Sequence, residues 1–398
     1  MIITGIIKDA LPPEANRFRR RSIAGRLLTM RHREDHPGLA NPRWLRLVLS
    51  ALLLVALWAM EDAGGVFAAS AAAGTGSDFS RQWIMGLYSH DWEADFFTLA
   101  PQSERPYMSH PHVNVVWQKV EPEKGKFTWD ALDRAMQLLL DNGSTDFLFT
   151  LDKFLPAWAG PQLGPPNNLD DWRAFVRAVA QRYGKYVDYY EIWNEPSFDV
   201  NSPAAKQHGA VHFGGNFLTD YPPILKAAYE EIKAVDPRSM VICGSLNDAT
   251  TPVPENGVTY YRTLTDSAHR IQDYCDAFGL HPYYNPPDWG RFYDAVQQVM
   301  AENGVRKELV VTEVGWLHNI DNGLEIQRQA IGMVGVGSLV ERGCRKFWIY
   351  QDLDDPPGQT FDFDYGLLDY QGNPHPAWNS FKAWVLAFNF FDLPFPPL

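Results

Sequence analysis

The chain has 398 residues, of which 45% are hydrophobic and 14% aromatic, so it can bury one large core. Its net charge of −13 argues against nucleic acid as a partner of the folded part. The three cysteines, Cys243, Cys275 and Cys344, include no closely spaced pair, which argues against a zinc site or redox motif. We expect buried thiols; one disulfide with one free thiol is the alternative.

The N-terminal region has the layout of an export signal. Residues 1–46 are polar and rich in arginine, the apolar run Leu47–Met60 follows, and a stretch of small residues ends near residue 76. The run is shorter than the ~20 apolar residues that cross a bilayer comfortably. We therefore predict a basic leader at 1–46, a signal peptide or membrane anchor with its linker at 47–77, and a folded domain at 78–398.

Several features of this region stay open. Cleavage near Ala69 or Ala71 and an uncleaved anchor are alternatives, as is translation from Met30, which would give a signal of ordinary length. The alternative to an export signal is that Leu47–Met60 forms a buried core helix. Basic residues before the run and acidic residues after it orient the N-terminus toward the cytoplasm. The folded domain is thus expected to be periplasmic, membrane-anchored or secreted.

From residue 84 onward, strand-like apolar segments alternate with amphipathic helices. The predicted strands are Ile84–Tyr88, Val113–Val116, Phe147–Leu151, Asp188–Asn194, Met240–Ser245, Ala277–His281, Leu309–Val314 and Phe347–Tyr350. The predicted helices are Asp130–Asp141, Asp171–Tyr186, Tyr221–Val235, Tyr260–Arg270, Phe292–Glu302, Glu325–Glu341 and Pro376–Phe388.

Eight strands with intervening helices predict an α/β fold of the (β/α)8 TIM barrel class in a single domain. An open, doubly wound sheet is the alternative, but no glycine-rich phosphate-binding turn follows any of the strands. The segments 197–218 and 353–365 are predicted to form loops over one end of the barrel.

Two glutamates stand near the ends of predicted strands. Glu195 follows the fourth strand in Asn-Glu-Pro, and Glu313 lies near the end of the seventh in Val-Thr-Glu-Val-Gly-Trp. Chemistry in TIM barrels takes place at the carboxyl ends of the strands, and these two strands lie across the mouth from each other. Two carboxyl groups that flank one bond are what glycoside hydrolysis requires. We expect one with a raised pKa as general acid and one ionised.

These two motifs resemble the acid/base and nucleophile strands of the clan A glycoside hydrolases, with family 39 and biofilm exopolysaccharide hydrolases as the nearest relatives. The resemblance covers residues 84–388 in strand order and implies a retaining mechanism through a covalent glycosyl-enzyme. It implies that Glu195 is the acid/base, Glu313 the nucleophile, and Asn194 a ligand of the sugar 2-hydroxyl. No cofactor and no metal ion are implied.

The resemblance also implies roles for residues around the pair. His281 and Tyr283 match a His-x-Tyr motif in which the tyrosine bonds the nucleophile, and Trp348 matches an aromatic floor on the eighth strand. Many clan members carry an arginine on the second strand. This chain has none there, and we expect Trp117 or His110 to occupy the space.

Other candidates rest on position alone. Asp152 and Lys153 end the third strand and are expected to line the cleft, with a loop ion pair as the alternative. Trp158 and Trp316 are expected either to stack on sugar rings or to pack in the core. The acidic residues of 352–364 are read as a solvated loop rather than a calcium site, since their spacing is not that of an EF-hand. His208 and His212 have metal-pair spacing, but they lie in a glycine-rich loop and are not taken as ligands.

Asn194 and Glu195 are adjacent, so regular strand alternation would send their side chains to opposite faces. Because both are assigned to one sugar, we predict irregular backbone at 194–196, where Pro196 already ends the ladder. The sequence as a whole predicts an exported retaining β-glycosidase that acts within a polysaccharide. The alternatives are an exo-acting β-xylosidase-like or β-glucosidase-like enzyme, and a non-catalytic glycan-binding barrel in polysaccharide export. Oligomeric state is left open.

Overall fold

The structure is a computed structural model, and it describes residues 83–89, 99–202, 205, 211–247, 255–283, 286–318, 322–332, 334–357 and 364–391. The predicted leader at 1–46 and the predicted signal or anchor at 47–77 lie outside these residues. Within the described part of the chain, no helix is long and apolar enough to cross a membrane.

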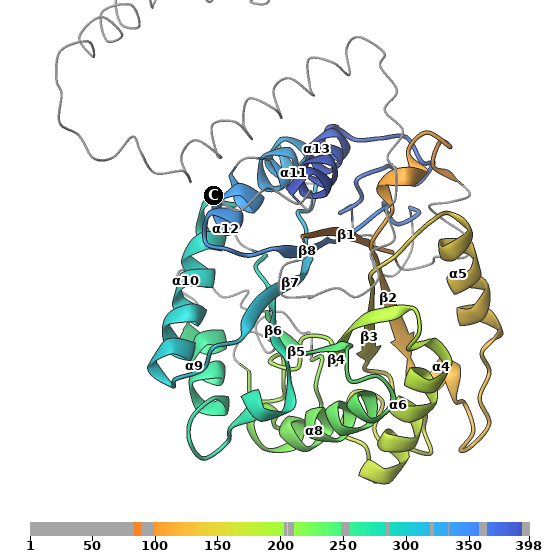
Figure 1. The fold of residues 1–398 in the computed structure, drawn as a ribbon, viewed down its shortest axis with the longest axis vertical. Coiled ribbons are helices and arrows are strands. Elements are labelled where there is room, and N and C mark those ends of the chain that lie inside the picture. The colour runs from red at the N-terminus through yellow and green to blue at the C-terminus, as the bar shows by residue number, and fades with distance from the viewer. Residues whose placement is uncertain are drawn as a thin grey trace, which may run out of the picture. The chain divides into compact units, whose positions relative to one another are not determined.

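Eight parallel strands form a closed barrel in which each strand pairs with the next along the chain, and β8 closes the ring on β1 (Figure 1). The strands are β1 (Ile84–Tyr88), β2 (Pro111–Val116), β3 (Phe147–Asp152), β4 (Val187–Ile192), β5 (Met240–Asn247), β6 (Ala277–His281), β7 (Glu308–Val314) and β8 (Lys346–Ile349). This confirms the predicted (β/α)8 TIM barrel.

Helices surround this ring of strands (Figure 1). They are α4 (Trp117–Val120), α5 (Asp130–Asp141), α6 (Leu169–Tyr183), α8 (Phe217–Val235), α9 (Glu255–Leu264), α10 (Pro286–Glu302), α11 (Gly323–Ile331), α12 (Gly335–Glu341) and α13 (Pro376–Phe391), with the 3-10 turns η4 (Arg105–Tyr107) and η5 (Ile271–Tyr274). Neighbouring helices pack against one another in pairs, α6 on α8, α10 on α12 and α11 on α13.

Two helices begin before their predicted starts because asparagine side chains cap them. Asn168 accepts a hydrogen bond from the backbone of Asp170, so α6 begins at Leu169 rather than at Asp171. Asn216 does the same for Leu218, and α8 therefore begins at Phe217, with both of its prolines inside the helix.

Two predicted helices are wrong. The helix expected at Tyr260–Arg270 ends at Leu264, and Arg270, with a φ of 48°, leads into η5 instead. The single helix expected at Glu325–Glu341 is two helices, because Gly332 leaves the helical conformation with a ψ of −141°. Apolar residues continue on both sides of Gly332, which is why the sequence pattern did not reveal that break.

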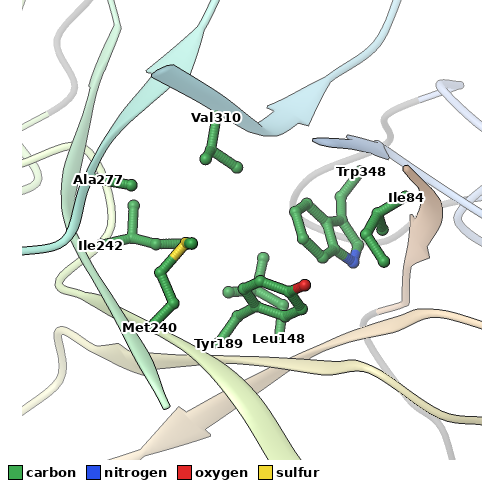
Figure 2. Packing of buried hydrophobic residues seen from close by; sticks show 8 residues of the cluster. All are labelled: Ile84, Leu148, Tyr189, Met240, Ile242, Ala277, Val310 and Trp348. Atoms are coloured by element: carbon green, nitrogen blue, oxygen red, sulfur yellow. The ribbon is translucent and has the colours of Figure 1, made fainter. Parts of the chain in front are cut away.

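A layer of apolar side chains packs inside the barrel. Figure 2 shows these side chains pointing into the same space, and we call them the apolar layer. Its members are Ile84, Leu148, Tyr189, Met240, Ile242, Ala277, Val310 and Trp348. Full burial of a Leu, Ile or Val side chain stabilises a fold by about 1.5–3 kcal/mol, so this layer is a major part of the core.

The three cysteines are free and buried, as expected, and the alternative of a disulfide is not realised. Burial raises the pKa of the Cys243 and Cys344 thiols to about 12. These thiols are therefore protonated at neutral pH and act as small apolar side chains.

Candidate active site

The fourth strand ends before its predicted limit and delivers Glu195 to the mouth of the barrel. Regular strand stops at Ile192, and both Trp193, with a φ of 68°, and Glu195, with a φ of 49°, have left-handed backbone. The irregular backbone predicted at 194–196 is thus present, and it begins at Trp193. The Trp193 indole N–H donates to the carbonyl of His212 at 3.0 Å, which ties this turn to the loop before α8.

Glu313 reaches the same space from β7. The ladder between β7 and β8 is irregular between Val311 and Val314, so Glu313 is not held to the alternation of a regular strand. The Tyr283 hydroxyl, which follows β6, donates a hydrogen bond to Glu313 Oε1. This is the contact that the His-x-Tyr motif implied.

The structure brings the two glutamates together. One oxygen of Glu195, one oxygen of Glu313 and a ring nitrogen of His281 all lie within 4.8 Å of one another. Glu195 is 5% exposed and Glu313 is partly exposed. The two carboxyl groups therefore lie close together at the carboxyl end of the barrel.

Two histidines flank Glu195. The Nδ1 atom of His281 lies 2.9 Å from Oε1, and the Nδ1 atom of His212 lies 2.7 Å from Oε2. His212 comes from the segment before α8, and its ring stacks on Phe198. His212 was not expected in the site, because a histidine in a glycine-rich loop gives no indication in the sequence of its neighbour in space. His208 lies outside the described residues.

The pKa values of the two carboxyl groups shift in opposite directions. Burial alone would raise the pKa of Glu195, but the contacts with His212 and His281 outweigh it and hold that pKa well below its usual range. Burial raises the pKa of Glu313 to about 7, with a further contribution from the negative charge of Glu195. Burial would lower the pKa of His281, but Glu313 and Glu195 raise it to about 9.

This order is the reverse of the expectation that the Glu195 carboxyl has the raised pKa. The two pKa values differ because the neighbours differ. Two imidazoles face Glu195, whereas Glu313 accepts a hydrogen bond from one tyrosine hydroxyl and faces another carboxyl group. In the free protein, Glu313 is therefore the more readily protonated of the two glutamates.

The aromatic residue near Glu313 at the end of the eighth strand is Tyr350, which directly follows β8, and not Trp348. Trp348 is fully buried in the apolar layer, where its ring meets Tyr189 (Figure 2). Tyr350 follows the end of β8 and packs edge-on against Tyr283 and Tyr365, which together form an aromatic wall. The expected substrate contact of Trp348 is therefore corrected.

Neither residue proposed for the space beside the second strand lies there. Trp117 begins α4 and is buried outside the barrel, stacked on Phe175, with its indole N–H bonded to Glu121. His110 precedes β2 at the amino end of the barrel, 3.2 Å from Asp146. At the carboxyl end, β2 instead presents Asn114, which donates to the Tyr88 hydroxyl at 2.7 Å.

Most of the remaining predicted residues lie at the carboxyl ends of β3, β4 and β7. Asn194 is partly exposed and directly precedes Glu195. Asp152 ends β3, and the ammonium of Lys153 lies 5.7 Å from the Phe154 ring centre. Trp316 follows β7 and is partly exposed. Trp158 packs edge-on against Trp117 and bonds the carbonyl of Glu121, so it lies with the α4 packing.

The acidic loop is not simply solvated. Asp354 is buried, and its two oxygens receive His318 Nε2 at 2.6 Å and His375 Nε2 at 2.8 Å. We call these three residues the histidine clasp. The clasp and the set Glu195, His281 and Glu313 each place three possible metal-ligand atoms within 4.8 Å. In each group a histidine nitrogen already contacts a carboxylate oxygen, so the polar atoms have partners without a metal ion.

A family profile described as beta-galactosidase matches residues 104–163 of the chain. No curated protein sequence matches. Because the profile match covers only the segment from η4 to the loop after β3, it does not by itself assign the chain to that family.

Solved structures with the same barrel are similar at low sequence identity. A family 39 glycoside hydrolase from Bacteroides cellulosilyticus is 18% identical with a TM-score of 0.57, and the match covers 78% of this chain and 65% of that longer one. A family 5 protein from Bifidobacterium longum, solved with Manβ1-4GlcNAc, is 15% identical with a TM-score of 0.59, over 79% and 80% of the two chains. Xylanase 10B from Thermotoga maritima is 15% identical with a TM-score of 0.56, over 78% and 97%. These likenesses establish the fold.

Proposed function

We propose that the protein is a retaining glycoside hydrolase of the clan A type, in which Glu195 and Glu313 are the two catalytic carboxyl groups. One observation carries the proposal: an oxygen of each glutamate lies within 4.8 Å of the other. Retaining enzymes hold their carboxyl groups about 5–5.5 Å apart, whereas inverting enzymes separate them by about 6.5–9.5 Å to admit a water molecule. The spacing thus favours a covalent intermediate.

The reaction has two steps. Glu313 attacks the anomeric carbon while the bond to the leaving oxygen breaks and that oxygen takes the proton of Glu195. Glu195 then removes a proton from water, the water oxygen replaces Glu313 on the sugar, and both glutamates return to their starting states. The hydrogen bond from Tyr283 supports Glu313 as the nucleophile, because it stabilises a carboxylate.

The opposite pKa shifts favour a specific alternative, in which Glu313 is the acid and Glu195 the nucleophile. In the assignment that we propose, Glu195 is protonated and Glu313 is ionised when the sugar is bound. The two assignments give different rescue products, so experiment can separate them.

The first experiment compares Glu195→Ala and Glu313→Ala on an aryl β-glycoside with a good leaving group and on an unactivated glycan. Loss of the acid/base should slow the unactivated substrate by about 100- to 10,000-fold and spare formation of the intermediate from the activated one. Azide should rescue Glu195→Ala with a β-glycosyl azide product. It should rescue Glu313→Ala with the α-anomer, since azide then attacks the sugar directly.

The control is Glu325→Gln, an exposed glutamate on α11, which should keep full activity. The α-anomer from the Glu195 variant would mean exchanged roles. Unchanged glycan cleavage in both alanine variants would overturn the enzyme assignment and leave the glycan-binding alternative.

For the substrate, we propose a β-linked polysaccharide cut within its chain. The aromatic wall of Tyr283, Tyr350 and Tyr365 supports this, because aromatic faces pack against sugar rings. A panel of β-linked polysaccharides, with product sizes followed in time, tests it. Oligosaccharides at early times support internal cleavage, and monosaccharides alone support the exo-acting β-xylosidase-like or β-glucosidase-like alternative.

We also propose that the protein is exported through residues 47–77, on the strength of the basic leader and the apolar run at Leu47–Met60. Fractionation of cells that express the full chain, followed by N-terminal sequencing, tests this. A mature terminus near Ala69 or Ala71 supports a cleaved signal, an intact terminus in the membrane fraction supports an anchor, and a cytoplasmic protein would overturn export.

A further inference from the structure

A third glutamate, Glu191, lies inside the barrel below the two at its mouth. It follows Tyr189 of the apolar layer by two residues in β4, and it is completely buried. Thr150 donates to its Oε2 at 2.8 Å, and Thr312 donates to its Oε1 at 2.8 Å. Ser245 donates to the same Oε1 through its hydroxyl and through its backbone N–H at 3.2 Å. Such a set of donors suits a carboxylate anion.

Each threonine also contacts a histidine. His112 Nε2 lies 2.6 Å from the Thr150 hydroxyl, and His281 Nε2 lies 3.1 Å from the Thr312 hydroxyl. A hydroxyl group has one hydrogen to donate. The Thr312 hydroxyl also contacts the Ser245 hydroxyl, which itself bonds Glu191. When Thr312 gives its hydrogen to Glu191 or to Ser245, its oxygen accepts from His281, and the Nε2 atom of His281 then carries a hydrogen.

This requirement links the charge of His281 to the proton of Glu195. With Nε2 already protonated, His281 can face an ionised Glu195 only as an imidazolium that donates from Nδ1 across the 2.9 Å contact. If His281 is neutral, its bare Nδ1 must accept a hydrogen from protonated Glu195. One proton is therefore held between these two atoms. The Glu191 carboxylate, 3.9 Å from His281 Nε2, favours the imidazolium.

We propose that Glu191 is a positioning residue that fixes the tautomer and favours the charged form of His281 through Thr312, and thereby sets where the shared proton rests beside Glu195. The proposal rests on the function proposed above for Glu195. The charged groups around the His281 ring are Glu191 below it and Glu195 and Glu313 beside it, with the Thr312 hydroxyl and the Tyr283 ring as polar neighbours.

The direct test follows the imidazole rather than the reaction. Histidine-labelled protein is titrated by NMR, with the His281 signal assigned from a His281→Gln sample. In Glu191→Gln the imidazolium loses its anionic neighbour, so the pKa of His281 should fall by about one unit or more, which corresponds to a tenfold change in proton affinity. In Thr312→Val the tautomer should no longer be restricted to Nε2–H. Thr312→Ser restores the hydroxyl and should return the parent spectrum.

Thr150→Val is the matched control, because it removes the same kind of hydroxyl on the His112 side of Glu191. It should leave the His281 tautomer unchanged. If Glu191→Gln does not fold, the Thr312 pair still tests the tautomer. An unchanged His281 pKa in folded Glu191→Gln, or an unchanged tautomer in Thr312→Val, would overturn the proposal.

The kinetic test uses the pH profile of kcat/KM. The alkaline limb should move to lower pH in Glu191→Gln, because the proton shared by His281 and Glu195 is lost more readily. A purely structural role would lower kcat equally at every pH and leave the limb in place. If the protein hydrolyses no glycoside, the proposed function fails, while the NMR titration still decides whether Glu191 controls His281.

Discussion

At the scale of single residues, carboxyl groups in this barrel differ in pKa because their neighbours differ. Two histidines lower the pKa of Glu195, whereas burial raises that of Glu313. Asp188, at the start of β4, shows the second effect without any role in the site. Burial raises its pKa to about 7, and the negative charge of Asp146 adds to the shift.

Asp188→Asn is expected to stabilise the protein at alkaline pH. The pKa of Asp188 is higher in the folded chain than the ~3.9 of an unfolded aspartate, so its ionised form is disfavoured by folding. The parent therefore loses stability as pH rises from about 4 through 7, and the asparagine variant does not. Thermal unfolding should show a higher Tm for the variant at pH 8 and a small difference at pH 4.

The control for this prediction is Asp141→Asn, which changes an exposed side chain at the end of α5 and should change the Tm little. Equal Tm differences between Asp188→Asn and the parent at pH 4 and pH 8 would contradict the assigned cause.

At the scale of elements, the end of β4 is held in place by a tyrosine of α8. The Tyr221 hydroxyl donates to the carbonyl of Ile192, the last strand residue, at 2.7 Å, and accepts from the N–H of Gly244 in β5 at 2.6 Å. There is no room for a side chain at Gly244, since a Cβ would lie 2.4 Å from the Ile192 carbonyl oxygen. This junction fixes the point where the chain turns toward Glu195.

Tyr221→Phe should lower the free energy of unfolding by about 1–3 kcal/mol, because it leaves the buried N–H of Gly244 without its partner. Urea unfolding measures this. Tyr260→Phe, which removes a half-buried hydroxyl that bonds Asp199 at 3.3 Å, is the matched control and should cost less. An equal decrease in the free energy of unfolding of both variants would mean that the hydrogen bonds of Tyr221 stabilise the fold no more than that of Tyr260.

Elements were predictable where local pattern and tertiary structure agree. The bounds of β1, β6 and α5 match the sequence prediction, because apolar runs and helical periodicity mark them without ambiguity. The break at Gly332 was missed because one glycine does not interrupt the apolar pattern of α11 and α12.

The candidate site divides in the same way. Glu195, Glu313 and Tyr283 could be placed from strand ends and motifs. Glu191 could also have been found, because a charged residue within a buried strand indicates a polar partner inside the barrel. His212 could not be predicted from the sequence, because its contact with Glu195 depends on the path of the loop before α8. The substrate contact assigned to Trp348 failed because position along a strand does not say how deep a side chain lies.

At the scale of the whole molecule, the last elements close the barrel onto the first. β8 pairs with β1, and α13 packs against both β1 and α11. The histidine clasp joins three parts of this closure: His318 follows β7, Asp354 lies after β8, and His375 immediately precedes α13.

Asp354→Asn should destabilise the protein by about 1.5–3 kcal/mol at pH 7, the usual range for hydrogen bonds to a charged group. Burial alone would raise the pKa of Asp354, but His318 and His375 outweigh it and lower that pKa. The stability that it contributes is therefore present above about pH 4 and is lost as pH falls through the lower folded pKa.

Urea unfolding at pH 7 and at pH 3 tests this prediction, and the difference between variant and parent should shrink at pH 3. Asp294→Asn, which removes an exposed partner of Arg342, is the control and should change stability little at either pH. A difference that does not change with pH would contradict an ionised Asp354.

The apolar layer fills the barrel interior with packed side chains, among them Tyr189 against Trp348 (Figure 2). We therefore expect sugar and water to reach the two glutamates from the carboxyl end of the barrel. In the second step of the proposed double displacement, the attacking water takes the place that the leaving sugar has vacated. A dissolved alcohol can take the place of water in this step. The fraction of sugar transferred to the alcohol would then measure how well it competes with water for the glycosyl-enzyme.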